Sequence, residues 1–346
     1  MTPGRSLLGA LVGDAELEAL FSDEADLQAQ IRIEAALAMA EAECGLIAPE
    51  AATAIGEACA RFVPDLAVLA GSMAQDGVMV PGLVRQLRAA VGDIHGAALH
   101  MGATSQDLID TSLVLRLGRA ITILEARLDA LGAGLVALKA RDGSRRLMAH
   151  TRMQVALPFS AADKIATWQA PLVRHKTRLA ELKPRLLLLQ LGGPVGTRVE
   201  LGERADAIAA NLAARLGLGH APPWHSQRDG IAEFGSWLSL VSGALGKLGQ
   251  DVALLAQNEV AALKVAGGGT SSAMAHKQNP VAAEVLVAMA RFNAGALGTL
   301  HQALVHENER SGAAWTLEWI VLPQMVVTTG AALTTAQTLV DALSFT

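Results

Sequence analysis

Two stretches of the chain place apolar residues alternately four and three positions apart. The first runs Leu117, Ile121, Leu124, Leu128, Leu131, Leu135 and Leu138, and the second runs Phe234, Leu238, Val241, Leu245, Leu248, Val252 and Leu255. This spacing gathers the apolar side chains on one narrow face of a helix, where they pack along a partner helix. Two such stripes in one chain predict a bundle of long helices.

Capping residues and prolines mark where further helices begin and end. Thr104 is predicted to cap the helix that carries the first stripe, with Asp107 three residues later as a short form of the capping box. Pro158 precedes a helix over residues 159–183, and Pro184 is predicted to stop it.

Strand signals are few in comparison. Pro280 precedes a helix over residues 281–308, whereas the apolar run over residues 186–191, followed by Gly192-Gly193-Pro194, is the one segment typical of a strand. Residues 1–103 are predicted to form a smaller N-terminal helical domain, and residues 104–346 the long central bundle. The shorter helices of the first domain are expected to break near Gly45, Pro64 and Pro81.

Hydrophobic residues make up 51% of the 346 residues, which indicates either a large buried helical core or a membrane segment. The stretch from Ile320 to Val340 carries no charge and is long enough to span a bilayer. It contains Pro323 and Gly330, and it lacks a flanking Lys or Arg and an aromatic belt. A buried core helix is therefore the favoured interpretation, and no membrane association is expected.

Charge and cysteine content exclude several classes of protein. The net charge is −5, and the 28 basic residues are spread along the chain, so no nucleic-acid surface is predicted. Cys44 and Cys59 are the only cysteines, too few for a disulfide framework and without partners at zinc spacing. We expect no metal and no cofactor. The amino terminus shows no signal-peptide pattern, which favours a cytoplasmic location.

The strongest chemical signal is the loop from Gly267 to Pro280, which lies between two apolar helical segments. Its glycines let the backbone approach a ligand closely. Lys277 and Asn279 can hold an anion through charge and hydrogen bonds, which leaves Ser271 or Ser272 free to carry a proton. This combination is typical of a site that moves a proton on a carboxylate substrate.

The same loop resembles the signature of the fumarase/aspartase superfamily, Gly-Ser-Ser-x-Met-Pro-x-Lys-x-Asn-Pro. The matching positions are Ser271, Ser272, Met274, Lys277, Asn279 and Pro280. Thr270 and Ala275 depart from the pattern, in place of the usual Gly and Pro. The resemblance implies an all-α fold, a fumarase/aspartase-like bundle that forms homotetramers with each active site shared among three subunits. It implies that Ser271 is the catalytic serine and that Lys277 assists it.

A second block, from Gly102 to Thr111, places hydroxyl groups and backbone donors at the start of a helix. An ordinary capped helix would show the same residues. The block also resembles the superfamily's Gly-x-Thr-Ser-x-Asp-x-x-Asp-Thr, which implies that Thr104 and Ser105 bind a substrate carboxylate.

A third block, from His150 to Pro158, resembles the superfamily's Arg-Thr-His-x-Gln-x-Ala-x-Pro, with Thr151 and Gln154 as matching polar positions. Arg152 stands where the superfamily has a His that protonates the leaving nitrogen in lyases such as adenylosuccinate lyase. An arginine does not give up its proton in a protein, so it cannot take that role. His150 lies two residues away, and an ordinary surface histidine is its favoured interpretation.

The fourth block discriminates within the superfamily. Residues 306–323 resemble the His-Glu-x-Glu/His-Arg-Ser-x-x-x-Trp-x-x-Glu-Trp segment of bacterial 3-carboxy-cis,cis-muconate cycloisomerases, and Trp224-His225 with Arg228 resembles a second segment of that group. The resemblance covers about residues 70–325, and it adds His225 and Arg310 to the substrate-binding candidates. Family members commonly carry a C-terminal helical domain, which we expect here to be short or absent.

A lactonisation explains why Arg152 replaces the histidine. The substrate's own carboxylate is the nucleophile, and it is ionised at neutral pH because carboxylic acids titrate near pH 4. Three alternatives remain open: a cycloisomerase for a sulfo-substituted muconate, a fumarate-releasing lyase such as adenylosuccinate lyase, and a non-catalytic helical scaffold. In each catalytic case the partner is a small polycarboxylate or similarly anionic substrate.

Overall fold

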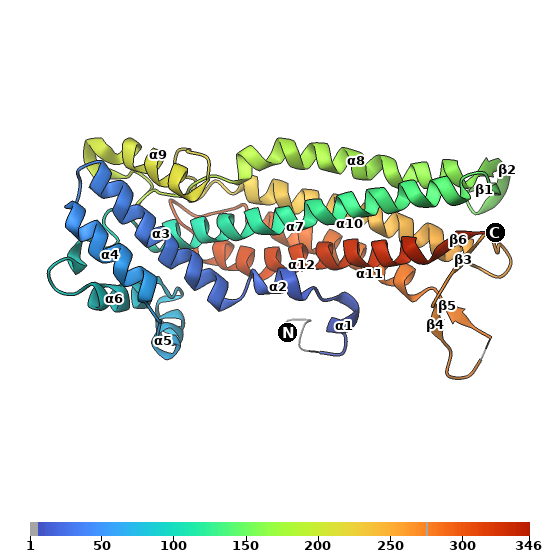
Figure 1. The fold of residues 1–346 in the computed structure, drawn as a ribbon, viewed down its shortest axis with the longest axis horizontal. Helices are drawn as coiled ribbons and strands as arrows, with labels where there is room; N and C mark the ends of the chain where they lie inside the picture. The colour runs from blue at the N-terminus through green and yellow to red at the C-terminus, as the bar shows by residue number, and fades with distance from the viewer. Residues whose placement is uncertain (1–5, 275) are drawn as a thin grey trace.

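The computed structural model describes residues 6–274 and 276–346 of the chain. Five long helices run side by side in an elongated bundle, with most of the shorter helices gathered around one end (Figure 1). The long helices are α7 (Ser105–Asp142), α8 (Ala161–Leu186), α10 (Asp229–Leu255), α11 (Val281–Gln302) and α12 (Gly312–Ala342). The shorter ones are α1 (Gly9–Val12), α2 (Ala15–Ala19), α3 (Asp23–Glu43), α4 (Pro49–Arg61), α5 (Leu66–Asp76), α6 (Val80–Val91), α9 (Ala205–Leu216) and the 3-10 segments Gly96–Ala98 and Val199–Arg204.

Strands occur only as three short antiparallel pairs in the described part of the chain. These are β1 (Arg146–Thr151) with β2 (Gln154–Ser160), β3 (Leu263–Val265) with β6 (Leu343–Phe345), and β4 (Gly269–Thr270) with β5 (Gln278–Asn279). The all-α prediction is confirmed, because every pair is a two-stranded attachment to the bundle rather than a sheet with its own core.

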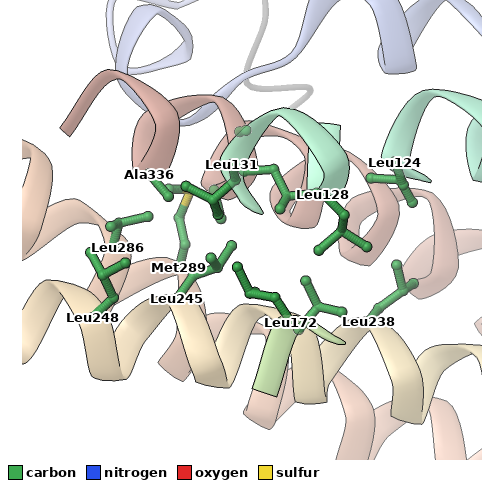
Figure 2. Packing of buried hydrophobic residues seen from close by; sticks show 14 of the residues in the cluster. Leu124, Leu128, Leu131, Leu172, Leu238, Leu245, Leu248, Leu286, Met289 and Ala336 are labelled. Carbon is green, nitrogen blue, oxygen red and sulfur yellow. The ribbon is translucent and has the colours of Figure 1, made fainter. Parts of the chain in front are cut away.

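The two apolar stripes form the centre of the bundle. Every stripe residue on α7 and α10 is buried, and all belong to one hydrophobic cluster with residues of α8, α11 and α12. Figure 2 shows Leu131 of α7 facing Leu245 of α10, with Met289 of α11 beside them. The bundle predicted from the spacing is confirmed.

α11 and α12 are each long and apolar enough to cross a membrane by length and composition alone. In α12, however, 67% of the apolar window is buried inside the bundle, against 28% in α11. Inward-facing residues such as Leu333 and Ala336 are fully buried, so the core helix predicted over residues 320–340 is present.

A second hydrophobic cluster lies at the end of the bundle where the short helices gather. It combines residues of α3 to α6, such as Leu37 and Leu83, with Leu189, Leu191 and residues of α9. Both ends of α7 are thereby fixed, its start by this cluster and its remainder by the bundle core. The domain division at residue 103 remains a prediction.

Two predicted boundaries are wrong. α8 passes through Pro184 and ends at Leu186, because a proline in the last turn removes few helical bonds. α11 ends at Gln302, so residues 303–308 lie outside it. The breaks predicted near Gly45, Pro64 and Pro81 are present, because α3, α4 and α5 end just before them and Pro81 is the second residue of α6.

The strand predicted over residues 186–191 is also absent. Beyond Leu186, which ends α8, the segment makes a single bridge from Leu188 to Gly219, and the Gln190 N–H donates to Thr111 Oγ1. The segment is rich in leucine because it packs against both hydrophobic clusters. Leu186 belongs to the bundle core, and Leu189 and Leu191 belong to the second cluster.

Candidate active site

The predicted site residues lie in three separate groups, which we call the helix-start, β1–β2 and β4–β5 patches. The helix-start patch contains Thr104, Ser105 and Arg310, with His225 behind them. The β1–β2 patch contains Thr151, Arg152 and Gln154, and the β4–β5 patch contains Ser271, Lys277 and Asn279.

The helix-start patch has the chemistry of an anion site. Arg310 Nη2 donates to Thr104 Oγ1 at 3.2 Å and to the Pro194 carbonyl at 3.1 Å. Because Thr104 Oγ1 accepts from Arg310, its own hydrogen is free to point at a ligand. Arg310 is exposed and forms no ion pair with a described residue. The N-terminus of α7, at Ser105, adds backbone donors and a favourable dipole.

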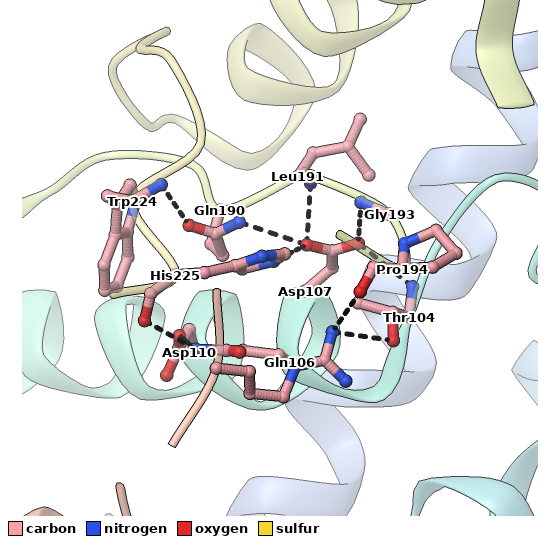
Figure 3. Close-up of polar contacts among 12 residues, drawn as sticks. Thr104, Gln106, Asp107, Asp110, Gln190, Leu191, Gly193, Pro194, Trp224 and His225 are labelled. Carbon is pink, nitrogen blue, oxygen red and sulfur yellow. Dashed lines mark hydrogen bonds and ion pairs between the residues drawn. The ribbon is translucent and has the colours of Figure 1, made fainter. Parts of the chain in front are cut away.

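A buried carboxylate lies directly behind this patch. Asp107 Oδ1 accepts from the Gly192 N–H at 2.7 Å, from His225 Nε2 at 3.0 Å and from Gln190 Nε2 at 3.1 Å. Its Oδ2 accepts from the N–H groups of Gly193 at 2.9 Å and Thr104 at 3.0 Å. Figure 3 shows these groups converging on Asp107. The capping box predicted at Thr104 is present, with Asp107 also serving as a hub that the sequence did not suggest.

His225 is buried and held by its contact with Asp107, and it does not lie at the surface. Its side chain is 4% exposed, its Nε2 contacts Asp107, and its Nδ1 has no hydrogen-bond partner among the described residues. Its backbone carbonyl accepts from Gln106 Nε2 at 2.9 Å. His225 thus packs under the helix start, and its assignment to substrate binding remains a prediction.

A fully buried ion network ties the 306–323 segment to α7. Arg228 donates to both oxygens of Asp110, at 2.7 and 3.0 Å, and to both oxygens of Glu318. Trp315 Nε1 donates to Asp110 Oδ1 at 3.0 Å. Burial disfavours the charged guanidinium, but the two carboxylates outweigh it and raise the pKa of Arg228. The polar groups of Arg228, Asp110 and Glu318 thus bond to one another, and the network fixes the first turns of α12 against α7.

His100 is a neighbour of the site that the sequence analysis missed. Its Nδ1 lies 2.6 Å from Glu34 Oε1, and its backbone has φ of 63°, which is uncommon outside glycine. Burial opposes the charged ring, but Glu34 outweighs it and raises the pKa of His100. Two features of the sequence could have indicated this pair: His100 lies four residues before Thr104, and Glu34 is a charged residue on the apolar face of α3.

The β1–β2 patch sits at the tip of an exposed hairpin. Thr151 pairs with Gln154, and the two turn residues Arg152 and Met153 have φ of 49° and 66°. A tight hairpin turn of this kind needs positive φ at both positions. The side chains of Thr151, Arg152 and Gln154 are exposed, and His150 is exposed with its Nδ1 3.1 Å from the Met148 carbonyl.

The β4–β5 patch holds a serine whose oxygen is already hydrogen-bonded. Ser271 Oγ accepts from the N–H groups of Met274 at 3.1 Å and Ala273 at 3.3 Å. These amides stabilise negative charge on the oxygen, which is what a proton-carrying serine requires. Lys277 is exposed and Asn279 is half-buried on the returning strand. Ala275, where the superfamily has Pro, lies outside the described residues.

One copy of the chain does not bring the three patches together. α7 has 38 residues and is therefore about 57 Å long, with Thr104 at its start and β1 beginning just after its end. Figure 1 shows β1–β2 and β4–β5 at the opposite end of the bundle from the start of α7. A cavity of about 410 Å³ between α3, α5 and α12 contains none of the predicted site residues.

The described residues include no group of three or more His, Cys, Asp or Glu placed to hold a metal ion. The hydroxyl, amide and guanidinium groups of the patches are suited to oxygen anions instead.

Comparison with known proteins gives one family. The family model described as Lyase matches residues 14–293. The 3-carboxy-cis,cis-muconate cycloisomerase of Pseudomonas aeruginosa is 42% identical over 99% of this chain and 76% of its own length. The 3-carboxy-cis,cis-muconate lactonizing enzyme of Pseudomonas putida superposes with a TM-score of 0.91 at 38% identity, over 98% of this chain and 77% of that one.

A fumarate lyase from Mesorhizobium sp. BNC1 superposes with the same TM-score of 0.91 at 31% identity, over 98% of this chain and 78% of that one. The fold is thus common to lyases and lactonizing enzymes, and the choice between these activities depends on the site residues. The matched family model and the shared bundle establish that this chain belongs to the lyase family, as an enzyme of the fumarase/aspartase superfamily.

Proposed function

We propose that the protein is a cycloisomerase that lactonises 3-carboxy-cis,cis-muconate to 4-carboxymuconolactone in the breakdown of aromatic acids. The observation that carries the choice is Arg152, which stands where nitrogen-releasing lyases have a proton-donating His. A lactonisation has no nitrogen to protonate, so the replacement leaves the reaction intact. The names of the relatives from Pseudomonas support the same choice.

In the proposed reaction one substrate carboxylate attacks the carbon–carbon double bond and forms the ring C–O bond. The π electron pair of the carbon–carbon double bond moves toward the conjugated carboxylate, which becomes a doubly charged aci-carboxylate. Ser271 then delivers its proton to the carbon alpha to that group. The resulting alkoxide is held by the N–H groups of Ala273 and Met274 and by the charge of Lys277 until solvent returns a proton.

The remaining patches bind the substrate carboxylates. Thr104, Ser105 and Arg310 would bind one carboxylate at the start of α7, where the dipole and the free hydroxyl hydrogens favour negative charge. Arg152 offers a planar fork that matches a second carboxylate. Thr151, Gln154 and Asn279 supply neutral donors around the same substrate.

Assembly completes the site in this proposal. The superfamily resemblance implies a homotetramer in which three subunits share each site, and the separation of the three patches within one copy supports it. The β1–β2 hairpin supports this inference, because it exposes Met153 by 75%, Val155 by 63% and Leu157 by 73%. An apolar hairpin of this kind is typical of a surface covered by a partner. We further propose a cytoplasmic enzyme without nucleic-acid or membrane partners.

Absorbance loss of 3-carboxymuconate, measured beside fumarate release from adenylosuccinate and argininosuccinate, tests the activity. We expect turnover of the muconate only, and release of fumarate from either lyase substrate would refute the assignment. Comparison with sulfomuconate decides which anionic group the site prefers. Full activity in a Ser271→Ala variant would refute the role of Ser271, and inactivity of the wild type on every substrate would favour the scaffold.

Mixing two inactive variants tests the shared site. Ser271→Ala removes the β4–β5 function, and Arg310→Ala removes the helix-start function, so each homotetramer should be inactive or strongly impaired. Hybrid tetramers formed by dissociating and reassembling the two variants together contain some sites that draw Ser271 from an Arg310→Ala chain and Arg310 from a Ser271→Ala chain. We therefore expect activity to return in the mixture. A mixture no more active than its components would contradict the sharing of sites between subunits.

A further inference from the structure

The carboxylate of Asp107 is surrounded only by hydrogen-bond donors. It is 2% exposed, and its five partners are three backbone N–H groups, the Gln190 amide nitrogen and a His225 ring nitrogen. An ionised carboxylate is an acceptor at both oxygens, so it satisfies all of them. A buried group with this many charge-assisted bonds is rigidly held.

The five donors come from separate segments of the chain. Thr104 belongs to the start of α7, Gly192 and Gly193 to the connection after α8, and His225 to the connection before α10. Gly193 has φ of 67°, and a Cβ there would lie 3.0 Å from the Gly102 carbonyl, so this turn requires glycine. Asp107 therefore holds three loops in one arrangement.

Oδ2 of Asp107 is hydrogen-bonded to the two backbone segments that Arg310 contacts. It accepts from the Thr104 N–H, and Thr104 Oγ1 accepts from Arg310. It also accepts from the Gly193 N–H, and the carbonyl of the next residue, Pro194, accepts from Arg310. The position of the Arg310 guanidinium thus depends on one carboxylate oxygen that never contacts it.

We infer that Asp107 is a positioning residue, which fixes Thr104 and Arg310 in the geometry that binds a substrate carboxylate. The inference rests on the proposed function only for the identity of the substrate, because the contacts themselves belong to any carboxylate site. Sequence resemblance assigns binding to Thr104, Ser105 and Arg310, and the structure adds the residue that makes them act together.

The test is Asp107→Asn, which keeps the size and shape of the side chain and replaces one acceptor oxygen by an NH₂ group that cannot accept a hydrogen bond. The amide oxygen would remain at the position with three donors, and the NH₂ group would face the N–H groups of Thr104 and Gly193. The NH₂ group and the two backbone N–H groups are all donors, so these two hydrogen bonds would be lost. We expect the dissociation constant for tricarballylate, a non-reactive tricarboxylate, to rise about tenfold or more by calorimetry, and KM to rise in parallel with a smaller change in kcat.

Coupling to Arg310 separates positioning from a general structural role. Arg310→Ala alone should weaken tricarballylate binding, and adding Asp107→Asn to it should weaken binding little further, since both changes disable the same contact. Asp26→Asn is the control, because Asp26 accepts a structural hydrogen bond from the buried Arg116 and lies away from the patch. It should lower the thermal midpoint and leave binding unchanged.

Three outcomes overturn the inference: Asp107→Asn binding tricarballylate as the wild type does, losses in the double variant that add in full, or a wild-type tetramer that does not bind the probe. The proposed function fails separately. If the wild type does not turn over muconates while Asp107→Asn and Arg310→Ala show coupled losses of binding, the positioning role stands and the substrate assignment falls.

Discussion

The buried network around Arg228 allows a prediction whose magnitude follows from the structure. Arg228→Met keeps the apolar volume and removes the cation that pairs with Asp110 and Glu318, which are 0% and 1% exposed. Breaking a buried pair by removing one partner costs about 3–5 kcal/mol. The unfolding entropy is about 2.1 cal/mol/K per residue, or about 0.7 kcal/mol/K for 346 residues. The thermal midpoint should therefore fall by about 4–7 °C at neutral pH.

The loss should also depend on pH, with a defined sign. Burial raises the pKa of Glu318 above its ordinary value even beside Arg228, whose charge opposes that rise, so removing Arg228 should raise the pKa of Glu318 further. A carboxyl group with a raised folded pKa contributes stability below its unfolded pKa and loses it as pH rises. The deficit of the variant relative to the wild type should therefore grow by about 1.4 kcal/mol per pH unit between the pKa of Glu318 in the wild type and its higher pKa in the variant.

Thermal unfolding at pH 5 and pH 8, at one protein concentration, measures both effects. Arg228→Lys is the matched control, because it keeps the charge and loses the planar fork over both carboxylates. We expect a smaller and less pH-dependent loss in that variant. A midpoint for Arg228→Met within 1 °C of the wild type, or an equal deficit at the two pH values, would refute the reasoning.

Three further predictions concern the core, the assembly and a buried acid. Burial, with a contribution from Glu34, raises the pKa of Glu41 from 4.5 to about 9, and neither carboxyl oxygen has a partner among the described residues. The wild type should therefore lose stability as pH rises from about 4.5 toward 9. In urea unfolding, Glu41→Gln should be as stable as the wild type near pH 4.5 and more stable than the wild type at pH 8. Stability curves that run parallel over this pH range would contradict the prediction. Combined Met153→Ser and Leu157→Ser should shift the protein to smaller species in light scattering and reduce activity in proportion, whereas an intact, fully active tetramer would argue against hairpin docking. Leu131→Ala, at a fully buried position, should cost about 2–5 kcal/mol, read as a lower thermal midpoint, and an unchanged midpoint would mean that the core refills the space.

The bundle could be predicted because its signal is periodic and local. The leucines of α7 recur at helical spacing, so their burial on one face followed directly. The run over residues 186–191 carries no such period. A short apolar run has the same appearance whether it is a strand or an irregular segment buried on two sides, and here two clusters bury it.

The β1–β2 hairpin escaped prediction for the opposite reason. Its strands expose apolar residues such as Val155 and Leu157, so no alternation of buried and exposed positions marks them in the sequence. Its turn uses Arg152 and Met153 at positive φ, where a sequence-based prediction expects Asn or Gly. In the proposed tetramer these strands would be buried by other copies of the chain, and a single sequence does not display such contacts.

Motifs located the chemical groups but not their arrangement. Ser271 and Thr104 could be predicted from the sequence because short blocks that combine hydroxyl groups with a lysine or an amide are suited to binding anions. The hub role of Asp107 and the pairing of His100 with Glu34 depend on contacts between residues more than 60 positions apart. Only the packing of α3, α7 and the loop after α8 creates them.

The length of α7 has a kinetic consequence for the proposed shared site. Because about 57 Å of helix separates the groups that bind substrate from the hairpin that follows, an isolated copy holds every residue type needed and no complete site. The rate per chain would then depend on protein concentration. On dilution below the assembly constant, velocity should fall faster than in proportion to enzyme, even while each helix remains folded.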